Sequence, residues 1–325
     1  MKFKSEAEAR DFSYRLRPYL REVSRSQLDS RLNDIWRNVM GFQNDGRIGL
    51  RSDHVPTKLF YRMFGDAISE YRAREIPIDG FGSSIAFEKS PWQTDSVKKV
   101  QRNLSLSHLT ERKGVFCKYG ARKYMQALHQ RGQVRIAPAA SFNDTNLGYA
   151  RHDDELHTPY YISPYDFDLG LVMEPLLSAL PVRQQYELWH CKPTNFYLYC
   201  VTVGFDYRYL IDFSKVGEPV DAVVVITDQN EFVRRLKKAS KKIWPEFGHA
   251  FQMVNYFDPY WMTTRLEFPT PDVYFYKSIP YLYQSEHRLV VWPRTEKQIL
   301  SDKWSAEIIE IGSLEDISEY YEIIA

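Results

Sequence analysis

Residues 278–293 read SIPYLYQSEHRLVVWP, and this stretch decides how the second half of the chain is interpreted. Its tyrosines, leucines, valines and tryptophan, bounded by prolines, predict a β-strand. Because strand side chains alternate between faces, three polar residues should share one otherwise apolar face: Gln284, Glu286 and Arg288. Two interpretations follow. The row is either a solvated edge strand with a surface ion pair, or a polar site set into the wall of an apolar pocket.

The composition is that of an ordinary globular protein of one or two domains. Of the 325 residues, 44% are hydrophobic and 26% are charged, and the net charge of +1 gives no strong overall field toward nucleic acid or membrane. No run approaches the 18 apolar residues of a membrane span, and the N-terminus lacks an apolar secretory segment. Three cysteines fit neither a disulfide framework nor a metal motif. A cytoplasmic location is expected.

Hydrophobic periodicity divides the chain into a helical N-terminal region, a connecting segment and a larger domain, over residues 1–76, 77–112 and 113–325. Helices are expected over 5–40, with a break at Pro18, and over 57–76, 94–112, 121–132 and 230–244. Residues 41–56 and 141–165 are expected to be loops. Strands are expected over 114–119, 133–139, 196–205, 221–227 and 304–313. The pattern predicts an α+β fold with short helices on a mostly antiparallel sheet.

Three segments of the larger domain carry polar residues in a defined order: Lys118-Tyr119, then Phe142-Asn143-Asp144, then Gln284-Ser285-Glu286-His287-Arg288. In order and form these segments resemble a family of mostly bacterial proteins of unassigned function. That family carries Lys-Tyr or His-Tyr on a strand, then S-P-x-x-F-N-D after a helix, and E-x-E-x-R late in the chain. The shared pattern predicts that these residues lie together at one site.

The same layout is similar to the ADP-ribosyltransferase superfamily, over roughly residues 115–290. There a first strand carries Arg or His, a middle strand carries Ser, Thr or Tyr, and a late strand carries the catalytic Glu. The resemblance implies an ADP-ribosyltransferase-like split sheet, with NAD as the donor substrate and no metal. This chain departs from the pattern at Lys118, at Cys200-Val201-Thr202 and at Gln284.

The resemblance implies a role for each matching residue. Glu286 would stabilise the oxocarbenium-like cation that forms when nicotinamide leaves the ribose, and removing its charge should change folding little. Gln284 would contact the acceptor. The residues expected to bind NAD are Lys118, Tyr119, Phe142, Asn143, Asp144, Thr202 and Arg288. Nearby aromatic side chains would stack on nicotinamide: Tyr149, Tyr160 and Tyr161. As alternatives, Lys118 is a snorkelling lysine at a strand end and Phe142–Asp144 an ordinary turn.

Two further segments have charged patterns. Residues 231–244, EFVRRLKKASKKIW, combine an apolar stripe with six cations: Arg234, Arg235, Lys237, Lys238, Lys241 and Lys242. This face either keeps the protein soluble or contacts a phosphate backbone. Residues 149–161, YARHDDELHTPYY, read as a solvated acidic loop, or else as the metal site of a nuclease. The two histidines, five residues apart, do not match a helical metal motif.

The predicted function is therefore transfer of ADP-ribose from NAD to a macromolecule, with nucleic acid as the favoured acceptor. The resemblance suggests a bacterial toxin or anti-phage defence effector, with an antitoxin or regulatory protein as a partner and no membrane association. The main alternative is a non-enzymatic module that binds a nucleotide or a protein. A third hypothesis is a metal-dependent nuclease.

Overall fold

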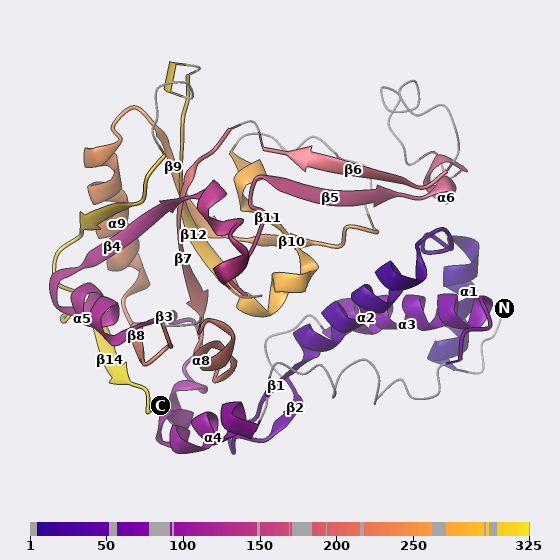
Figure 1. Ribbon diagram of the computed structural model, residues 1–325, viewed down its shortest axis with the longest axis horizontal. Coiled ribbons are helices and arrows are strands. Elements are labelled where there is room, and N and C mark those ends of the chain that lie inside the picture. The colour runs from indigo at the N-terminus through magenta and orange to yellow at the C-terminus, as the bar shows by residue number, and fades with distance from the viewer. Residues whose placement is uncertain are drawn as a thin grey trace.

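The computed structural model describes residues 5–51, 57–77, 92, 94–147, 150–168, 170, 184–192, 194–214, 218–261, 271–295, 297–298 and 304–324 (Figure 1). Over these ranges helices combine with a large antiparallel sheet, so the predicted α+β class is confirmed. In Figure 1 the sheet and its helices occupy one side, and the N-terminal helices and a two-stranded arm occupy the other. Among the described helices, none is long and apolar enough to cross a bilayer.

The N-terminal region contains three helices: α1 (Glu6–Leu16), α2 (Arg25–Val39) and α3 (Thr57–Ala73). The side chain of Ser5 caps α1 by accepting from the backbone N–H of Glu8, and Ser24 forms a reciprocal capping box with Gln27 at the start of α2. Pro18 lies between α1 and α2, where proline was expected to interrupt the helix. Their apolar faces pack into one core with α3. The predicted loop over 41–56 instead includes a small antiparallel hairpin, β1 (Met40–Phe42) and β2 (Ile48–Leu50).

Eight strands of the described chain form one antiparallel sheet. Their bounds are β3 (Phe116–Gly120), β4 (Gln133–Pro138), β7 (Tyr197–Val203), β8 (Ala222–Ile226), β9 (Gly248–Met253), β12 (Glu286–Trp292), β13 (Glu307–Glu310) and β14 (Ser318–Glu322). The order is β13–β4–β7–β3–β8–β14, and β12 lies on the other edge of β7 with β9 beyond it. Strand β12 is therefore central, and the interpretation of residues 286–292 as a solvated edge strand is wrong.

Strands β3 and β4 share one edge of β7 but pair with different parts of it. Strand β4 pairs with residues 197–198 and β3 with residues 202–203. Between these two contacts, Lys118 Nζ donates a 2.6 Å hydrogen bond to the carbonyl of Cys200. The lysine thus satisfies a backbone acceptor at the point where the two strands separate.

Helices cover both faces of the sheet. On one face, α5 (Arg122–Arg131) and α9 (Gln229–Ile243) bury the largest apolar core. On the other face, the β3–β8 end is covered by α4 (Thr94–Arg102), η2 (Leu104–Leu109) and α8 (Arg208–Asp212). The β7–β12 end is covered by η3 (Ala139–Phe142) and η5 (Asp272–Phe275), both 3₁₀ helices. Helix α4 gives way to η2 within the single helix predicted over 94–112.

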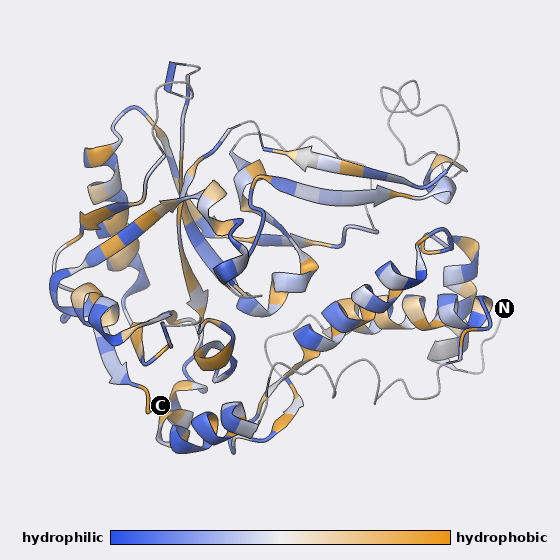
Figure 2. Ribbon diagram, viewed as in Figure 1, coloured by the Kyte–Doolittle hydropathy of each residue, from blue (hydrophilic) through white to orange (hydrophobic). Residues whose placement is uncertain are grey.

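An arm extends from the sheet domain over the N-terminal helices (Figure 1). It consists of the antiparallel strands β5 (His157–Ile162) and β6 (Tyr186–Cys191), and the short helix α6 (Pro164–Asp168) follows β5. The predicted loop over 141–165 therefore includes η4 (Thr145–Leu147) and the strand β5. Figure 2 shows that the arm is more hydrophilic than the central strand β7, so the sequence carries a weaker strand signal there.

A short parallel pair leads into β12. Strand β10 (Asn255–Phe257) pairs with β11 (Tyr276–Ser278), and the 3₁₀ helix η6 (Ile279–Gln284) follows directly. Residues 279–284 therefore form η6 in place of the strand that the sequence predicts, and Ser278 is the last residue of β11. Pro280 stands in the first turn of η6, where a missing N–H costs nothing, and Ser285 (φ 44°) turns the chain into β12.

Gly132 provides a test of the packing between α5 and the C-terminal strands. It ends α5 with φ 65°, and a Cβ atom there would lie 1.9 Å from the carbonyl oxygen of Gly312. Gly114 has a similar φ of 76° with nothing within 4 Å. In urea unfolding, Gly114→Ala should cost about 1 kcal/mol for backbone strain alone, and Gly132→Ala more than about 2 kcal/mol because strain and overlap add. Equal losses would contradict the packing described.

Candidate functional site

The site is built around the start of β12, where Glu286 follows η6 after the single residue Ser285. The buried side chain of Asn38 on α2 holds η6: Nδ2 donates to the carbonyl of Ile279 (3.0 Å), and Oδ1 accepts from the backbone N–H of Tyr283 (2.7 Å). Alternation along β12 then places Glu286 and Arg288 on the face of the sheet opposite α9. This face is interior, so both charges need partners there.

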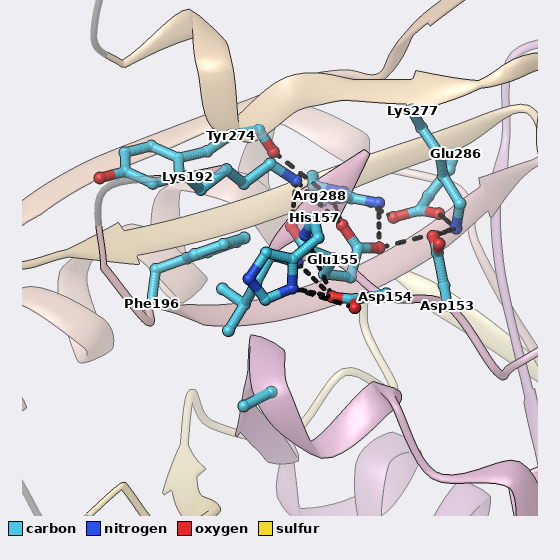
Figure 3. A network of polar contacts seen from close by, with 12 residues as sticks. Asp153, Asp154, Glu155, His157, Lys192, Phe196, Tyr274, Lys277, Glu286 and Arg288 are labelled. Carbon is cyan, nitrogen blue, oxygen red and sulfur yellow. Dashed lines mark hydrogen bonds and ion pairs between the residues drawn. The ribbon is translucent and has the colours of Figure 1, made fainter. Parts of the chain in front are cut away.

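Six charged side chains meet at this point and form what we term the ion cluster: Asp153, Glu155, Lys192, Lys277, Glu286 and Arg288 (Figure 3). The guanidinium of Arg288, fully buried, donates to both oxygens of Glu155 (2.7 and 2.9 Å) and through Nε to Glu286 (2.7 Å). Such bidentate, charge-assisted bonds are the strong ones. Arg288 therefore joins the loop before β5 to β12.

Lysines complete the charge balance of the ion cluster. Lys277 Nζ lies 3.3 Å from Glu286, 3.0 Å from Asp153 and 3.7 Å from Glu155. Lys192 Nζ lies 3.5 Å from Glu155 and also donates to its backbone carbonyl. Three carboxylates thus face three cations, and the cluster is neutral when all six are ionised.

The pKa values follow from burial and from this pairing. Burial alone would raise the pKa of Glu286, but the charges of Arg288 and Lys277 outweigh it and lower the pKa to about 2. Burial raises the pKa of Asp153 to about 6, because Lys277 is shared with other carboxylates and counteracts burial only in part. Asp153 is therefore the carboxylate of the cluster that is held least firmly in its ionised form.

A cavity of about 380 Å³ lies beside the ion cluster. Its wall comes from α2, the loop before β5, both strands of the arm, β11 and η6. The charged lining residues are Asp34, Asp153, Asp154, Glu155, Lys192 and Lys277, with His157 and the aromatic residues Trp189, Tyr276 and Tyr281. Glu286 and Arg288 lie one layer behind this wall. A cavity of this size is typical of small-molecule sites.

The structure corrects the expected placement of the polar row in residues 278–293. Gln284 lies in η6, not on the strand face; its Oε1 accepts from Lys277 (3.1 Å) and its Nε2 donates to the carbonyl of Ala150 (2.7 Å). Only 3% of its surface is exposed, which leaves no surface for the predicted contact with an acceptor. Glu286, 5% exposed, is within the ion cluster and does not itself line the cavity.

The predicted NAD contacts on β3 and β7 lie outside the cavity wall. Lys118 lies with its Nζ 4.5 Å from the ring centre of Tyr199, on the α5–α9 side of the sheet. Tyr119 is buried in the core on the other side, where its hydroxyl accepts from the N–H of Asp206 (3.1 Å). Thr202 is the cross-strand partner of Glu286, but its hydroxyl donates to the carbonyl of Cys117 (3.2 Å).

The Phe142–Asp144 turn lies outside the cavity wall and forms hydrogen bonds with the acidic loop. The carbonyl of Phe142 accepts from the N–H of Asp153 (3.0 Å), and Asn143 Nδ2 donates to Asp154 (3.2 Å). Asp144 caps the turn through the N–H of Asn146 (2.9 Å). The turn thus holds the acidic loop, and none of its residues lines the cavity.

The aromatic residues expected to stack on nicotinamide are placed elsewhere. Tyr160 is buried in a small apolar core of the arm, and Tyr161 stacks on Tyr260 with ring centres 4.4 Å apart. Tyr149 lies outside the described residues. The aromatic groups that border the cavity are Trp189, Tyr276 and Tyr281 instead.

The basic face of α9 is remote from the cavity. Phe232 and Leu236 of α9 pack on the face of the sheet opposite Glu286. Arg234 and Arg235 both pair with Glu231, and Arg235 also pairs with Asp316. The remaining four cations of the helix form no ion pair with an acidic residue of the described chain: Lys237, Lys238, Lys241 and Lys242.

Sequence reasoning missed Glu155, Lys192 and Lys277. The acidic loop was expected to be solvated, yet Glu155 is 5% exposed and binds Arg288. One signal was available: Lys277 is a single cation in the apolar stretch VYFYKSIPYLY, and a lysine buried there requires carboxylate partners. Over the described ranges, no three His, Cys, Asp or Glu side chains are grouped as metal ligands would be.

No family model, curated protein or solved structure matches this chain.

Arg288→Met tests the cluster as a unit. It leaves Glu155 and Glu286 buried without their main cation, so the free energy of unfolding should fall by about 3–5 kcal/mol. Adding Glu155→Gln should recover part of the loss by removing one uncompensated charge. Arg15→Met, which breaks a pair with Asp11 whose arginine is 75% exposed, should change stability by less than about 0.5 kcal/mol. Urea denaturation measures all three. An additive double variant would argue against a shared cluster.

Asp153→Asn tests the raised pKa. The native protein binds the Asp153 proton more tightly than the unfolded chain, whose carboxyl pKa is 3.8. The wild type therefore loses stability as pH rises from about 4 to above 6, and the variant does not. Relative to wild type, the variant should gain about 1–3 kcal/mol over this window. Unfolding midpoints between pH 4.5 and 8 give the difference; a difference that is constant with pH would show that Asp153 is not perturbed.

Proposed function

We propose that the protein binds NAD in the cavity, breaks the nicotinamide–ribose bond and transfers ADP-ribose to a macromolecular acceptor. The observation that carries the proposal is a cavity wall with carboxylates of a buried, charge-balanced cluster beside three aromatic side chains: Trp189, Tyr276 and Tyr281. Aromatic rings can stack on nicotinamide, and fixed carboxylates can stabilise the sugar cation.

The carboxylates of the wall are suited to different roles. Loss of nicotinamide leaves positive charge on the ribose, which a carboxylate facing it stabilises. Glu155 forms a bidentate ion pair with Arg288, whereas Asp153 is paired with Lys277, which also contacts Glu155 and Glu286. We therefore assign Asp153 as the carboxylate available to the cation, and Glu155 as the group that fixes the wall.

Glu286 contributes from behind the wall in this proposal. Its two oxygens contact Arg288 and Lys277, so its charge holds both cations in place and leaves less of the charge of Lys277 to neutralise Asp153. Glu286 is thus a positioning residue for the carboxylates that face the substrate. Its charge also adds to the negative potential at the cavity floor.

The charge of the cavity favours one orientation of NAD. Four carboxylates line it against two lysines: Asp34, Asp153, Asp154 and Glu155 against Lys192 and Lys277. An acidic excess attracts the positively charged nicotinamide ring and repels the diphosphate. The nicotinamide–ribose half would therefore enter, and the diphosphate would remain at the mouth.

The arrangement of strands supports the resemblance from which the proposal began. Lys118, Thr202 and Glu286 come from β3, β7 and β12, which are neighbours in the sheet in that order. The separation of β3 and β4 along β7 is compatible with the split sheet of an ADP-ribosyltransferase-like fold. That fold assignment is part of the proposal.

The acceptor and the biological setting follow from the resemblance alone. It suggests a cytoplasmic toxin or phage-defence effector, with an antitoxin or regulatory protein as a partner. Nucleic acid remains the predicted acceptor, because four lysines of α9 that form no ion pair within the described part of the chain could bind its phosphates at a distance from the cavity. The rival hypothesis is a non-enzymatic module that holds a nucleotide in the same cavity without cleaving it.

Glu286→Gln tests the proposal. Purified wild type should bind NAD in calorimetry and release nicotinamide. The variant should release it about 100-fold more slowly with little change in NAD affinity, because only the charge is removed. The burial of Glu286 also predicts a loss of stability of about 3 kcal/mol, larger than the sequence suggested, so rates are compared below the unfolding transition.

The matched control is Glu310→Gln, which removes the charge of an exposed strand glutamate far along the sheet in β13. It should leave NAD cleavage unchanged. Binding without nicotinamide release would favour the non-enzymatic module, and absence of binding at millimolar NAD would refute the proposed function altogether.

A further inference from the structure

A histidine–aspartate pair lies on the wall of the cavity, outside the ion cluster. His157 begins β5, and its Nδ1 lies 3.0 and 3.1 Å from the two oxygens of Asp154. Both residues line the cavity, and the side chain of His157 is 48% exposed. Figure 3 shows the ring beside the cluster, with its second nitrogen directed away from Asp154. The pair thus combines a fixed carboxylate with an imidazole that is open to a ligand.

Asp154 is held firmly enough to orient the ring. One of its oxygens accepts from the backbone N–H groups of Leu156 and His157 (both 3.1 Å). The other accepts from Asn143 Nδ2 (3.2 Å). A carboxylate with these donors cannot rotate away from His157 without losing several hydrogen bonds, so the ring orientation is fixed as well.

This pairing sets the tautomer of the neutral ring. A carboxylate only accepts hydrogen bonds, so the proton of the neutral imidazole stays on Nδ1 and the lone pair is on Nε2. Within the described part of the chain, Nε2 has no hydrogen-bond partner. A base whose orientation is set by a third group in this way is the arrangement that activates nucleophiles in unrelated enzymes.

We propose that His157 is the general base of the transfer step, with Asp154 as its positioning residue. This inference rests on the proposed function. The bond between C1′ of the ribose and the pyridinium nitrogen breaks, and its electron pair leaves with neutral nicotinamide. A lone pair of the acceptor forms the new bond to C1′, and the acceptor proton moves to Nε2 of His157. Asp154 faces the positive charge that the ring then gains.

A general base restricts the chemical class of the acceptor. Neutral O–H and N–H groups must lose a proton as they bond to C1′, whereas a carboxylate or thiolate has none to lose. The structure therefore points to a neutral hydroxyl, amide or ring N–H group as the acceptor. Water belongs to the same class, so NAD hydrolysis uses the same base and can serve as the assay.

Other charged groups also face the cavity and bear on any pH profile. They are Asp34 on α2, Asp153 and Glu155 on the preceding loop, Lys192 after β6, and Lys277 on β11. Of these, Asp153 has a pKa raised to about 6 by burial, so its own titration would shape a pH–rate profile. A pH profile alone therefore does not identify the base, and the variants below are needed.

The test uses the full chain with NAD as the only substrate and water as the acceptor. His157→Ala should lower kcat for nicotinamide release about 100-fold and leave the KM for NAD within about threefold. Because the side chain is half exposed, the vacated space is open to solvent, and imidazole in the buffer should restore a measurable part of the rate. Asp154→Asn should lower kcat as well, without rescue by imidazole. If His157 had a purely structural role, imidazole would not restore the rate of His157→Ala.

His108→Ala is the control, because His108 is an exposed histidine in η2 whose Nδ1 contacts the backbone carbonyl of Ser105 and whose ring lies against Tyr321. It should behave as wild type. If wild type cleaves NAD but His157→Ala keeps the full rate and the wild-type pH profile, the base assignment is wrong while the proposed function stands. If wild type does not cleave NAD, both are refuted.

Discussion

The buried guanidinium of Arg288 is the group on which the rest of the site depends. It is fully enclosed on the interior face of β12, where an unpaired charge would be prohibitively costly. Its two terminal nitrogens donate to Glu155 and hold the loop before β5 against the sheet. Its Nε donates to Glu286. Because two carboxylates then share one cation, further positive charge is needed, and Lys192 and Lys277 supply it. The burial of Arg288 therefore fixes where the end of β6, β11 and the acidic loop lie.

This cluster is better explained by function than by stability. Replacing buried ion pairs by apolar residues of similar volume is often neutral or stabilising, so a protein that needed only a core would gain little from six buried charges. Such charges hold geometry and electrostatic potential at fixed positions, and strongly shifted pKa values concentrate at functional sites. Asp153, whose pKa is raised, stands where the cluster meets the cavity. The ion cluster and the cavity beside it thus have the physical properties of a functional site, whatever the chain resembles.

Local periodicity predicted the helices and central strands because each carries its own pattern. Helices α2, α5 and α9 have amphipathic spacing and end signals, β8 is a continuous apolar run, and β7 is interrupted only by Thr202. Residues 279–284 were misassigned because the aromatic composition favours strand, whereas the geometry is set by Asn38 from a distant helix. The partners of Glu286 and Arg288 were missed for the same reason. They lie on β11 and in the acidic loop, and nothing local to either segment specifies the pairing.

The same long-range contacts explain why the N-terminal helices cannot be considered separately from the site. Asn38 uses both ends of its amide on η6, so α2 and η6 can shift relative to each other only by breaking buried hydrogen bonds. Arg31 adds a bidentate pair with Asp258, which joins α2 to the segment after β10. Asp34 of α2 lines the cavity, and η6, which α2 holds, leads directly into Glu286. Helix α2 therefore fixes both part of the cavity wall and the ion cluster behind it. A boundary near residue 76, clear in the sequence, therefore runs through a site that only both regions together complete.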